Sequence, residues 1–207
     1  MSTNSININI VLLGNSSVGK TSLLTRYTNN EFNNNYITTC GYDFETKDIK
    51  IYGKDVHLKI HDTVGQERYQ SIITSFYKKN DGFIFVFDVT NKQSFQEIQT
   101  WLKGVEENNE DFDCVLVGNK IDLKNSIEVN KEDVNNCDYL KNIKYFETSA
   151  KDNQNVQEVF EELTRMILEK FEKKGKIGRL DYMEKTGSFK IQNKKESQQE
   201  NKKKSCC

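Results

Sequence analysis

Apolar residues along the chain fall into short continuous runs and longer stretches with helical spacing. The short runs predict buried strands at residues 6–13, 83–87 and 114–117. Two more strand-like segments, 42–51 and 55–61, are separated by Tyr52-Gly53-Lys54, which favours a hairpin. Runs that are apolar on both faces are typical of strands that lie between two layers of helices.

The longer stretches predict helices at residues 20–28, 71–79, 93–106, 131–140 and 155–171. In the last of these, apolar residues recur at helical spacing and predict a face that covers a sheet. They are Val156, Val159, Phe160, Leu163, Ile167 and Phe171. Because strands and helices alternate along the chain, the predicted fold class is α/β, an open sheet with helices on both faces.

The helical periodicity ends after Lys174, where Lys, Gln, Ser and Asn become frequent. We therefore expect one folded domain at 1–174 and a disordered, flexible tail at 175–207. The tail has nine basic and four acidic residues, a net charge of +5, which leaves −6 for the rest of a chain whose net charge is −1. This balance predicts no general attraction to nucleic acid and indicates an anionic surface as the partner of the tail.

Composition narrows the class of protein further. The 22 aromatic residues (12 Phe, 9 Tyr and 1 Trp) supply enough apolar surface for a core. We expect an intracellular protein with a soluble body, because no run of 18 apolar residues and no secretory signal pattern is visible. The five Cys residues include no C-x-x-C pair, which disfavours a disulfide framework or a structural zinc site.

The first candidate site follows the first predicted strand and opens a helix, as a P-loop requires. Its residues fit the pattern G-x-x-x-x-G-K-[ST] and are Gly14, Asn15, Ser16, Ser17, Val18, Gly19, Lys20 and Thr21. Backbone N–H groups of such a loop and the N-terminus of its helix form a cradle for phosphates. Lys20 then supplies a positive charge to the β- and γ-phosphates, and the Thr21 hydroxyl binds Mg²⁺.

Two further segments lie where other predicted strands end. Asp62-Thr63-Val64-Gly65-Gln66 offers a carboxylate for Mg²⁺ through water, an N–H of Gly65 for the γ-phosphate and a side chain, Gln66, to orient an attacking water. In Asn119-Lys120-Ile121-Asp122 the carboxylate of Asp122 can accept from N1–H and the exocyclic amine of guanine, a donor pair that adenine lacks. A base-contacting N–H is expected from the segment that ends the next strand, Thr148-Ser149-Ala150-Lys151.

In this order the motifs resemble those of Ras-superfamily small GTPases, specifically the Rab family, from about residue 6 to residue 171. Gly41-Tyr42-Asp43-Phe44, Gln66-Glu67-Arg68-Tyr69 and Phe87-Asp88-Val89-Thr90-Asn91 resemble Rab signatures. The resemblance implies an open P-loop NTPase sheet, mostly parallel with one antiparallel hairpin strand. It also implies that Thr39 binds Mg²⁺ in the triphosphate state and that Phe32 packs against the base.

The resemblance further implies an effector surface. Its residues are Tyr36, Ile37, Thr38, Cys40, Gly41, Tyr42, Asp43, Phe44, His61 and Phe76. His61 stands where the family usually has Trp, Cys40 replaces Ile, and Val64 replaces Ala. We expect Val64 to alter hydrolysis or nucleotide exchange, because β-branching stiffens a segment that must rearrange. His61 either titrates near neutral pH, with an effect on effector binding, or is a passive surface imidazole.

The chain ends in Lys202-Lys203-Lys204-Ser205-Cys206-Cys207. The ending is not a C-a-a-X box, but Cys206 and Cys207 resemble the Rab site for two geranylgeranyl groups. Two lipid chains give stable anchoring where one is marginal, and lysines add attraction to an anionic leaflet. The implied location is the cytoplasmic face of an intracellular or plasma membrane, with a cytosolic pool.

The sequence therefore predicts a GTP-binding and GTP-hydrolysing switch of vesicle-mediated membrane traffic. By resemblance its partners are an exchange factor, a GAP, a GDP-dissociation inhibitor or escort protein, and effectors. One alternative is a GTP-locked scaffold with negligible hydrolysis, which Val64 favours and Gln66 disfavours. The other is a P-loop kinase or ATPase, which the segment 119–122 disfavours.

Overall fold

The computed structural model describes residues 5–33, 43–63, 77–78 and 80–178, with only the backbone of Asp43. Within these ranges six strands form one sheet in the order β2-β3-β1-β4-β5-β6. The strands are β1 (Ile6–Leu13), β2 (Asp43–Ile51), β3 (Lys54–Asp62), β4 (Gly82–Asp88), β5 (Asp113–Asn119) and β6 (Lys144–Thr148). Neighbouring strands are parallel except for the antiparallel pair β2 and β3, which confirms the predicted sheet.

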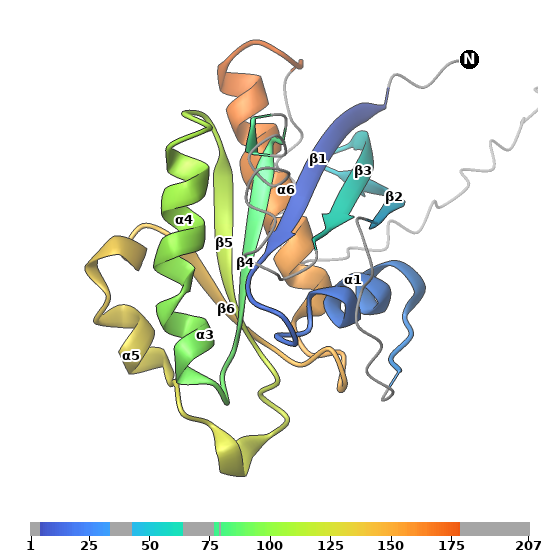
Figure 1. The fold of residues 1–207 in the computed structure, drawn as a ribbon. Helices are drawn as coiled ribbons and strands as arrows, with labels where there is room; N and C mark the ends of the chain where they lie inside the picture. The colour runs from blue at the N-terminus through green and yellow to red at the C-terminus, as the bar shows by residue number, and fades with distance from the viewer. Residues whose placement is uncertain (1–4, 34–42, 64–76, 79, 179–207) are drawn as a thin grey trace, which may run out of the picture.

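Helices cover both faces of this sheet (Figure 1). They are α1 (Lys20–Asn29), α3 (Lys92–Gln96), α4 (Ile98–Glu106), α5 (Lys131–Asn135) and α6 (Val156–Lys173), with 3₁₀ turns η2 (Lys124–Ser126) and η3 (Asp138–Leu140). Alternate residues of β1 point to opposite sides: Ile10 and Leu12 belong to the core cluster under α1 and α6, whereas Val11 and Leu13 belong to the cluster under α3, α4 and α5. The two apolar faces explain why the central strands read as continuous hydrophobic runs.

The predicted hairpin joins β2 and β3 through Tyr52 and Gly53. Both residues have positive φ, 51° and 72°, as a two-residue turn of the hairpin type requires. Tyr52 accepts this conformation while its ring is buried, and its hydroxyl donates to Glu169 Oε1 of α6 at 3.0 Å. The turn is therefore held down on the helix that covers it.

One predicted helix is interrupted by a single residue, and another is shorter than predicted. The helix expected at 93–106 consists of α3 and α4, which meet at Glu97, where the backbone N–H groups of Thr100 and Trp101 both bond to the carbonyl oxygen of Glu97. The helix expected at 131–140 stops at Asn135, because Cys137 has an extended backbone before η3 begins. Residues 135–138, Asn-Asn-Cys-Asp, are all weak helix formers, which explains this break.

The predicted helix at 71–79 lies almost wholly outside the described residues. At the other end of the chain, α6 stops at Lys173, and Ile177 packs against the core cluster under α1 and α6. The domain boundary at 174 and the flexible tail to 207 stay predictions. Among the described helices, none has both the length and the apolar composition needed to cross a membrane.

Candidate functional site

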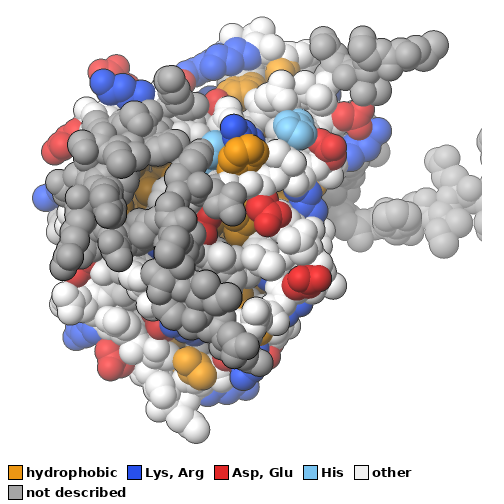
Figure 2. All heavy atoms as spheres, turned by 45° about the vertical axis from the view of Figure 1, so that its right-hand side comes forward, with side chains coloured by type: hydrophobic (Ala, Val, Ile, Leu, Met, Phe, Trp, Pro, Cys, Tyr) orange, Lys and Arg blue, Asp and Glu red, His pale blue; other side chains and the backbone are white. Residues whose placement is uncertain are grey.

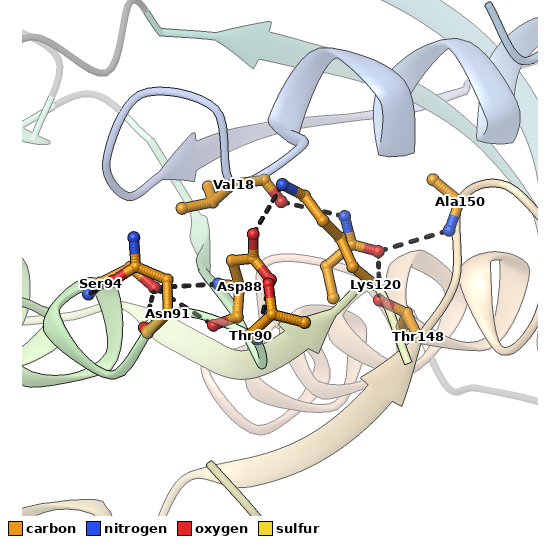
Figure 3. A network of polar contacts seen from close by, with 9 residues as sticks. Val18, Asp88, Thr90, Asn91, Ser94, Lys120, Thr148 and Ala150 are labelled. Carbon is orange, nitrogen blue, oxygen red and sulfur yellow. Dashed lines mark hydrogen bonds and ion pairs between the residues drawn. The ribbon is translucent and has the colours of Figure 1, made fainter. Parts of the chain in front are cut away.

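Five segments come together at one edge of the sheet, beyond the carboxyl ends of its parallel strands, and all but residues 88–91 have predicted chemistry. Figure 3 shows the parts of this edge around Val18, Asp88, Lys120 and Ala150. Residues 14–21 follow β1, 62–63 end β3, 88–91 follow β4, 119–122 follow β5, and 148–151 follow β6. Open α/β sheets bind ligands at this edge. The hydrogen bonds described next show that the segments are in direct contact.

The loop before α1 depends on glycine at both ends. Gly14 has φ 143°, and a Cβ there would lie 2.1 Å from the carbonyl oxygen of Val86. Gly19 has φ 98°, and a Cβ there would lie 2.4 Å from Nδ2 of Asn119. The glycines of the motif therefore allow the loop to approach β4 and β5 in a backbone conformation that other residues rarely adopt.

Lys20 is the buried cation of this loop. Its ammonium group donates to the carbonyl oxygens of Gly14 at 2.8 Å and Asn15 at 2.7 Å. Burial lowers the pKa of Lys20 to about 8, and the negative charge of Asp62 acts in the opposite direction. The side chain is thus mostly protonated at pH 7 and stands beside the N-terminus of α1, an arrangement that favours a bound anion.

Thr21 and Asp62 meet next to Lys20. The Thr21 hydroxyl donates to Asp62 Oδ2 at 2.5 Å, and Asp62 is only 1% exposed. A hydroxyl and a carboxylate in contact are the hard oxygen ligands that Mg²⁺ prefers, and Mg²⁺ usually completes its shell with phosphate and water. This pair of oxygen atoms therefore fits a Mg²⁺ ion that also binds phosphate. Among the described residues there is no group of three or more His, Cys, Asp or Glu that could hold a metal ion.

Asn119 joins three of the loops through one buried amide. Its Nδ2 donates to the carbonyl oxygen of Val18 at 3.0 Å. Its Oδ1 accepts from the Thr148 hydroxyl at 3.1 Å and from the Ala150 N–H at 3.3 Å. Asn119 therefore sets the distance between the loop at 14–21 and the loop at 148–151.

Asp122 is held by the loop after β6. The Ser149 hydroxyl donates to Asp122 Oδ1 at 2.7 Å, and the N–H of Asp152 donates to Ser149 Oγ at 3.0 Å. These bonds fix one carboxylate oxygen of Asp122 in place. The Lys151 side chain is exposed, so this residue contributes to the loop through its backbone.

Lys120 has positive φ, 72°, and forms an ion pair with Asp88 Oδ2 at 2.6 Å (Figure 3). Oδ1 of Asp88 accepts from the backbone N–H and the hydroxyl of Thr90. Residues 87–91 were predicted from the sequence only as a family signature, with no role in the site. An Asp at the carboxyl end of a buried strand was the available signal.

Two other connections were missed because nothing in the local sequence marks them. Nδ2 of Asn15 donates to Glu97 Oε2 at 2.5 Å, and the Trp101 indole N–H donates to Asn15 Oδ1 at 3.0 Å, so the P-loop is tied to α4. On the opposite side, the Arg26 guanidinium donates to the carbonyl oxygens of Ala150 and Lys151. It also lies 5.9 Å from the ring centre of Phe32, which is half-buried against the core.

The described part of the predicted effector surface lies on β2 and β3. Phe44 is 46% exposed, with Lys59 Nζ 4.1 Å and the His61 ring 6.1 Å from its ring centre. Figure 2 turns this side of the molecule forward and shows hydrophobic, basic and histidine side chains next to one another. The surface-imidazole interpretation of His61 is wrong, because its exposure is 6%. Burial also lowers the pKa of His61, which argues against titration near neutral pH.

Several predicted site residues lie outside the described residues. They are Tyr36, Ile37, Thr38, Thr39, Cys40, Gly41, Tyr42, Val64, Gly65, Gln66, Phe76, Cys206 and Cys207. Asp43 is placed only by its backbone, which pairs with Asp62 in the β2–β3 ladder.

Comparison with known proteins identifies the family. The model of the Ras family matches residues 9–169. Rab-13 of Bos taurus is 42% identical over 160 residues, which are 77% of this chain and 79% of that protein. Rab-8B of Homo sapiens is 40% identical over 166 residues, 80% of each chain. Rab-10 of Diplobatis ommata is 41% identical over 162 residues, 78% of this chain and 81% of that protein.

The chain is a Rab small GTPase of the Ras family. Ras-family proteins of this type hydrolyse GTP to GDP, so the Rab chain is a GTPase and a switch in membrane traffic. The predicted family and fold are thereby confirmed. The roles of individual site residues are proposals, which follow.

Proposed function

We propose that this Rab protein binds GTP and GDP with Mg²⁺ at the edge formed by the loops after β1, β3, β5 and β6, and that it recruits effectors in its GTP state. The observation that carries the proposal is the amide of Asn119, which bonds both to Val18 in the phosphate loop and to Ala150 in the loop after β6. A single ligand can therefore place its phosphates on one loop and its base on the other.

The phosphates lie on the backbone N–H groups of residues 14–21, with Lys20 beside the β- and γ-phosphates. The base lies against Asp122, whose carboxylate accepts from the two neighbouring donors of guanine. The segment of Ser149, Ala150 and Lys151 supplies a backbone donor for the base, and Asn119 and Lys120 support this part of the site. The N–H of Lys151 is the candidate donor, because those of Ser149 and Ala150 already bond to Gln154 and Asn119. Phe32 packs against the base by family resemblance. Adenine offers neither of these donors to the Asp122 carboxylate, which gives strong discrimination.

Thr21 and Asp62 would hold Mg²⁺, Asp62 through water, and Thr39 would join them in the triphosphate state. The bound ion neutralises charge on the phosphates. The hydrogen bond between the Thr21 hydroxyl and the Asp62 carboxylate supports this assignment, because it places the two oxygen atoms close enough to serve one ion.

Hydrolysis requires a water placed in line with the γ-phosphate, and Gln66 orients it. The segments of Thr39 and Gly65 are ordered by the triphosphate and released after hydrolysis, so the effector surface is complete only in the GTP state. Turnover is slow alone, and a GAP that supplies an arginine raises it by ~10³–10⁵. An exchange factor then restores the GTP state.

The tail, residues 175–207, attaches the protein to membranes in this proposal. Two geranylgeranyl groups on Cys206 and Cys207 anchor the Rab to the cytoplasmic face of an intracellular or plasma membrane, and a GDP-dissociation inhibitor or escort protein maintains a cytosolic pool. The net charge of +5 on residues 175–207 supports this role, since anionic leaflets attract such a segment.

Single-turnover hydrolysis tests the proposal. The purified protein is loaded with GTP or ATP, and product is followed after addition of Mg²⁺, in wild type, Gln66→Leu and Val64→Ala. We expect wild type to hydrolyse GTP and not ATP. Gln66→Leu is expected to hydrolyse GTP at least tenfold more slowly with unchanged GTP affinity, and Val64→Ala to hydrolyse it at an altered rate. A wild-type rate equal to that of Gln66→Leu indicates a GTP-locked scaffold, and turnover of ATP indicates a kinase or ATPase.

A further inference from the structure

We infer that Arg26 is a positioning residue for guanine recognition, which acts on Asp122 through the loop after β6. This inference rests on the proposed binding of guanine nucleotide at the site. Arg26 lies outside every motif that predicts the site, in the last turn of α1. Its guanidinium nevertheless bonds to a segment more than 120 positions away in the sequence.

The guanidinium spans two consecutive carbonyl groups. Nε donates to the carbonyl oxygen of Ala150 at 2.8 Å, and Nη2 donates to that of Lys151 at 3.2 Å. Nη1 donates to the carbonyl oxygen of Asn30, at the end of α1, at 2.7 Å. The planar fork of an arginine can make these bonds together, whereas a lysine ammonium is a single point on a flexible stem.

A chain of hydrogen bonds leads from this contact to Asp122. A peptide unit is planar, so the Lys151 carbonyl that accepts from Arg26 fixes the direction of the N–H of Asp152 in the same unit. That N–H donates to Ser149 Oγ at 3.0 Å, and the Ser149 hydroxyl donates to Asp122 Oδ1 at 2.7 Å. Each bond in such a chain polarises the next.

The loop between these ends is closed on itself and pinned to α1 a second time. Ser149 and Gln154 exchange both backbone hydrogen bonds, at 2.9 and 3.2 Å. Nδ2 of Asn153 donates to Oδ1 of Asn30 at 3.1 Å. The loop is therefore closed on itself, and Arg26 is the charged residue that binds it to α1.

Helix α1 thus contacts both ends of the proposed nucleotide site. Its first turn carries Lys20 and Thr21, and its last turn carries Arg26. Removal of the guanidinium loosens the loop, which then keeps its contacts with Asn30 and Asn119. Asp122 thereby loses part of the orientation that favours the donors of guanine. The phosphate loop keeps its own contacts, among them the bond from Asn119 to Val18.

The test compares GDP with IDP, which lacks the 2-amino group that donates to Asp122 in the proposed complex. Dissociation constants for both are measured with Mg²⁺ in wild type, Arg26→Met and Arg26→Lys. We expect GDP to bind at least tenfold more weakly to Arg26→Met and the IDP/GDP ratio of dissociation constants to fall at least threefold. Arg26→Lys recovers only part of the ratio. Arg165→Met is the matched control, because Arg165 pairs with Glu161 and Glu162 on α6, and it leaves the ratio unchanged.

An unchanged ratio in Arg26→Met overturns the inference, even if both nucleotides bind more weakly, since that result is a general structural effect. If Arg26→Met does not fold, Arg26→Gln replaces it under the same criterion. In an Asp122→Ala background the Arg26→Met change must lose its effect on the ratio, and an effect that persists also overturns the inference. Wild type that binds no guanine nucleotide refutes the proposed function itself.

Discussion

Asn119 and Asp122 follow the same strand, but their side chains meet different requirements. The amide of Asn119 both donates and accepts, so it can bond to a carbonyl oxygen on one side and to a hydroxyl and an N–H on the other. The carboxylate of Asp122 only accepts, and one of its oxygens already receives the Ser149 hydroxyl. The choice of acid or amide therefore follows from which donors each side chain must satisfy.

Asp122→Asn is expected to change base preference from guanine toward xanthine. The Asn oxygen still accepts from Ser149, but its NH₂ group faces the donors of guanine and instead suits xanthine, which has an oxygen in place of the amine. GDP affinity falls at least a hundredfold and XDP affinity rises, as measured by equilibrium binding of labelled nucleotides. Asp138→Asn, an exposed change at an ion pair with Lys141, is the control and leaves both affinities unaltered. Equal losses for both nucleotides contradict the assignment.

Cys114 is expected to be unreactive in the folded protein. Burial raises the pKa of its thiol to about 12, with further contributions from Asp113 and Glu106. At pH 8 only about one thiol in 10⁴ is then ionised. Because the folded pKa lies above the unfolded value, this thiol stabilises the fold fully below pH 9, and the contribution is lost as pH rises toward 12.

Iodoacetamide labelling at pH 8, read by peptide mass spectrometry, checks the prediction for Cys114. The peptide stays unlabelled in native protein for times at which urea-unfolded protein is fully modified. Equal labelling rates in the two states would show that the thiol is accessible and ionises normally.

At the scale of elements, α1 begins at one loop and is fixed to another. Its N-cap, Gly19, has positive φ, and a Cβ there would collide with the Asn119 amide that bridges the loops. The start of α1 can therefore pack against the Asn119 amide only because Gly19 has no side chain.

Gly19→Ala tests this dependence against a matched control, Gly175→Ala. Both positions have positive φ, 98° and 68°, which strains the backbone of any residue with a side chain. The free energy of unfolding is therefore expected to fall by about 1–2 kcal/mol in each variant. No atom lies within 4 Å of a Cβ at Gly175, whereas at Gly19 the Asn119 amide must move. GDP affinity is expected to fall at least tenfold in Gly19→Ala and to stay unchanged in Gly175→Ala, while urea unfolding reports the shared loss. Equal affinity in the two variants contradicts the close-packing explanation.

Elements that depend on local pattern were predictable, and those that depend on distant contacts were not. Alternating sides of β1 and the turn at Tyr52-Gly53 follow from residue type and spacing. The break at Glu97 does not, because helix-forming residues lie on both sides of it. The motifs placed the P-loop, Asn119 and Asp122, whereas the contact of Arg26 with Ala150 joins residues 124 positions apart and arises only from the tertiary fold.

The whole molecule has an uneven charge, with −6 on residues 1–174 and +5 on 175–207. An acidic body is repelled by an anionic membrane and a basic tail is attracted to it. In the proposed function, the body of the protein therefore binds the nucleotide, and the tail with its two cysteines holds the protein at a membrane surface.

Loss of one terminal cysteine is expected to make membrane binding short-lived. A single lipid chain gives marginal, reversible attachment, whereas two give stable anchoring. Prenylated wild type stays with phosphatidylserine-containing vesicles during flotation, and Cys206→Ser is released at least tenfold faster. The triple change Lys202→Gln, Lys203→Gln and Lys204→Gln weakens binding only to anionic vesicles. Identical release of wild type and Cys206→Ser would argue against a second lipid.

The nucleotide carried by the purified, untagged protein tests the central claim most directly. The protein is denatured, and the released small molecules are resolved by chromatography and quantified against protein concentration. GDP in nearly equal molar amount is the expected result, because a hydrolysing switch that binds tightly keeps its product. Retained GTP would point instead to a locked scaffold and to Val64, and the absence of guanine nucleotide would contradict the claim.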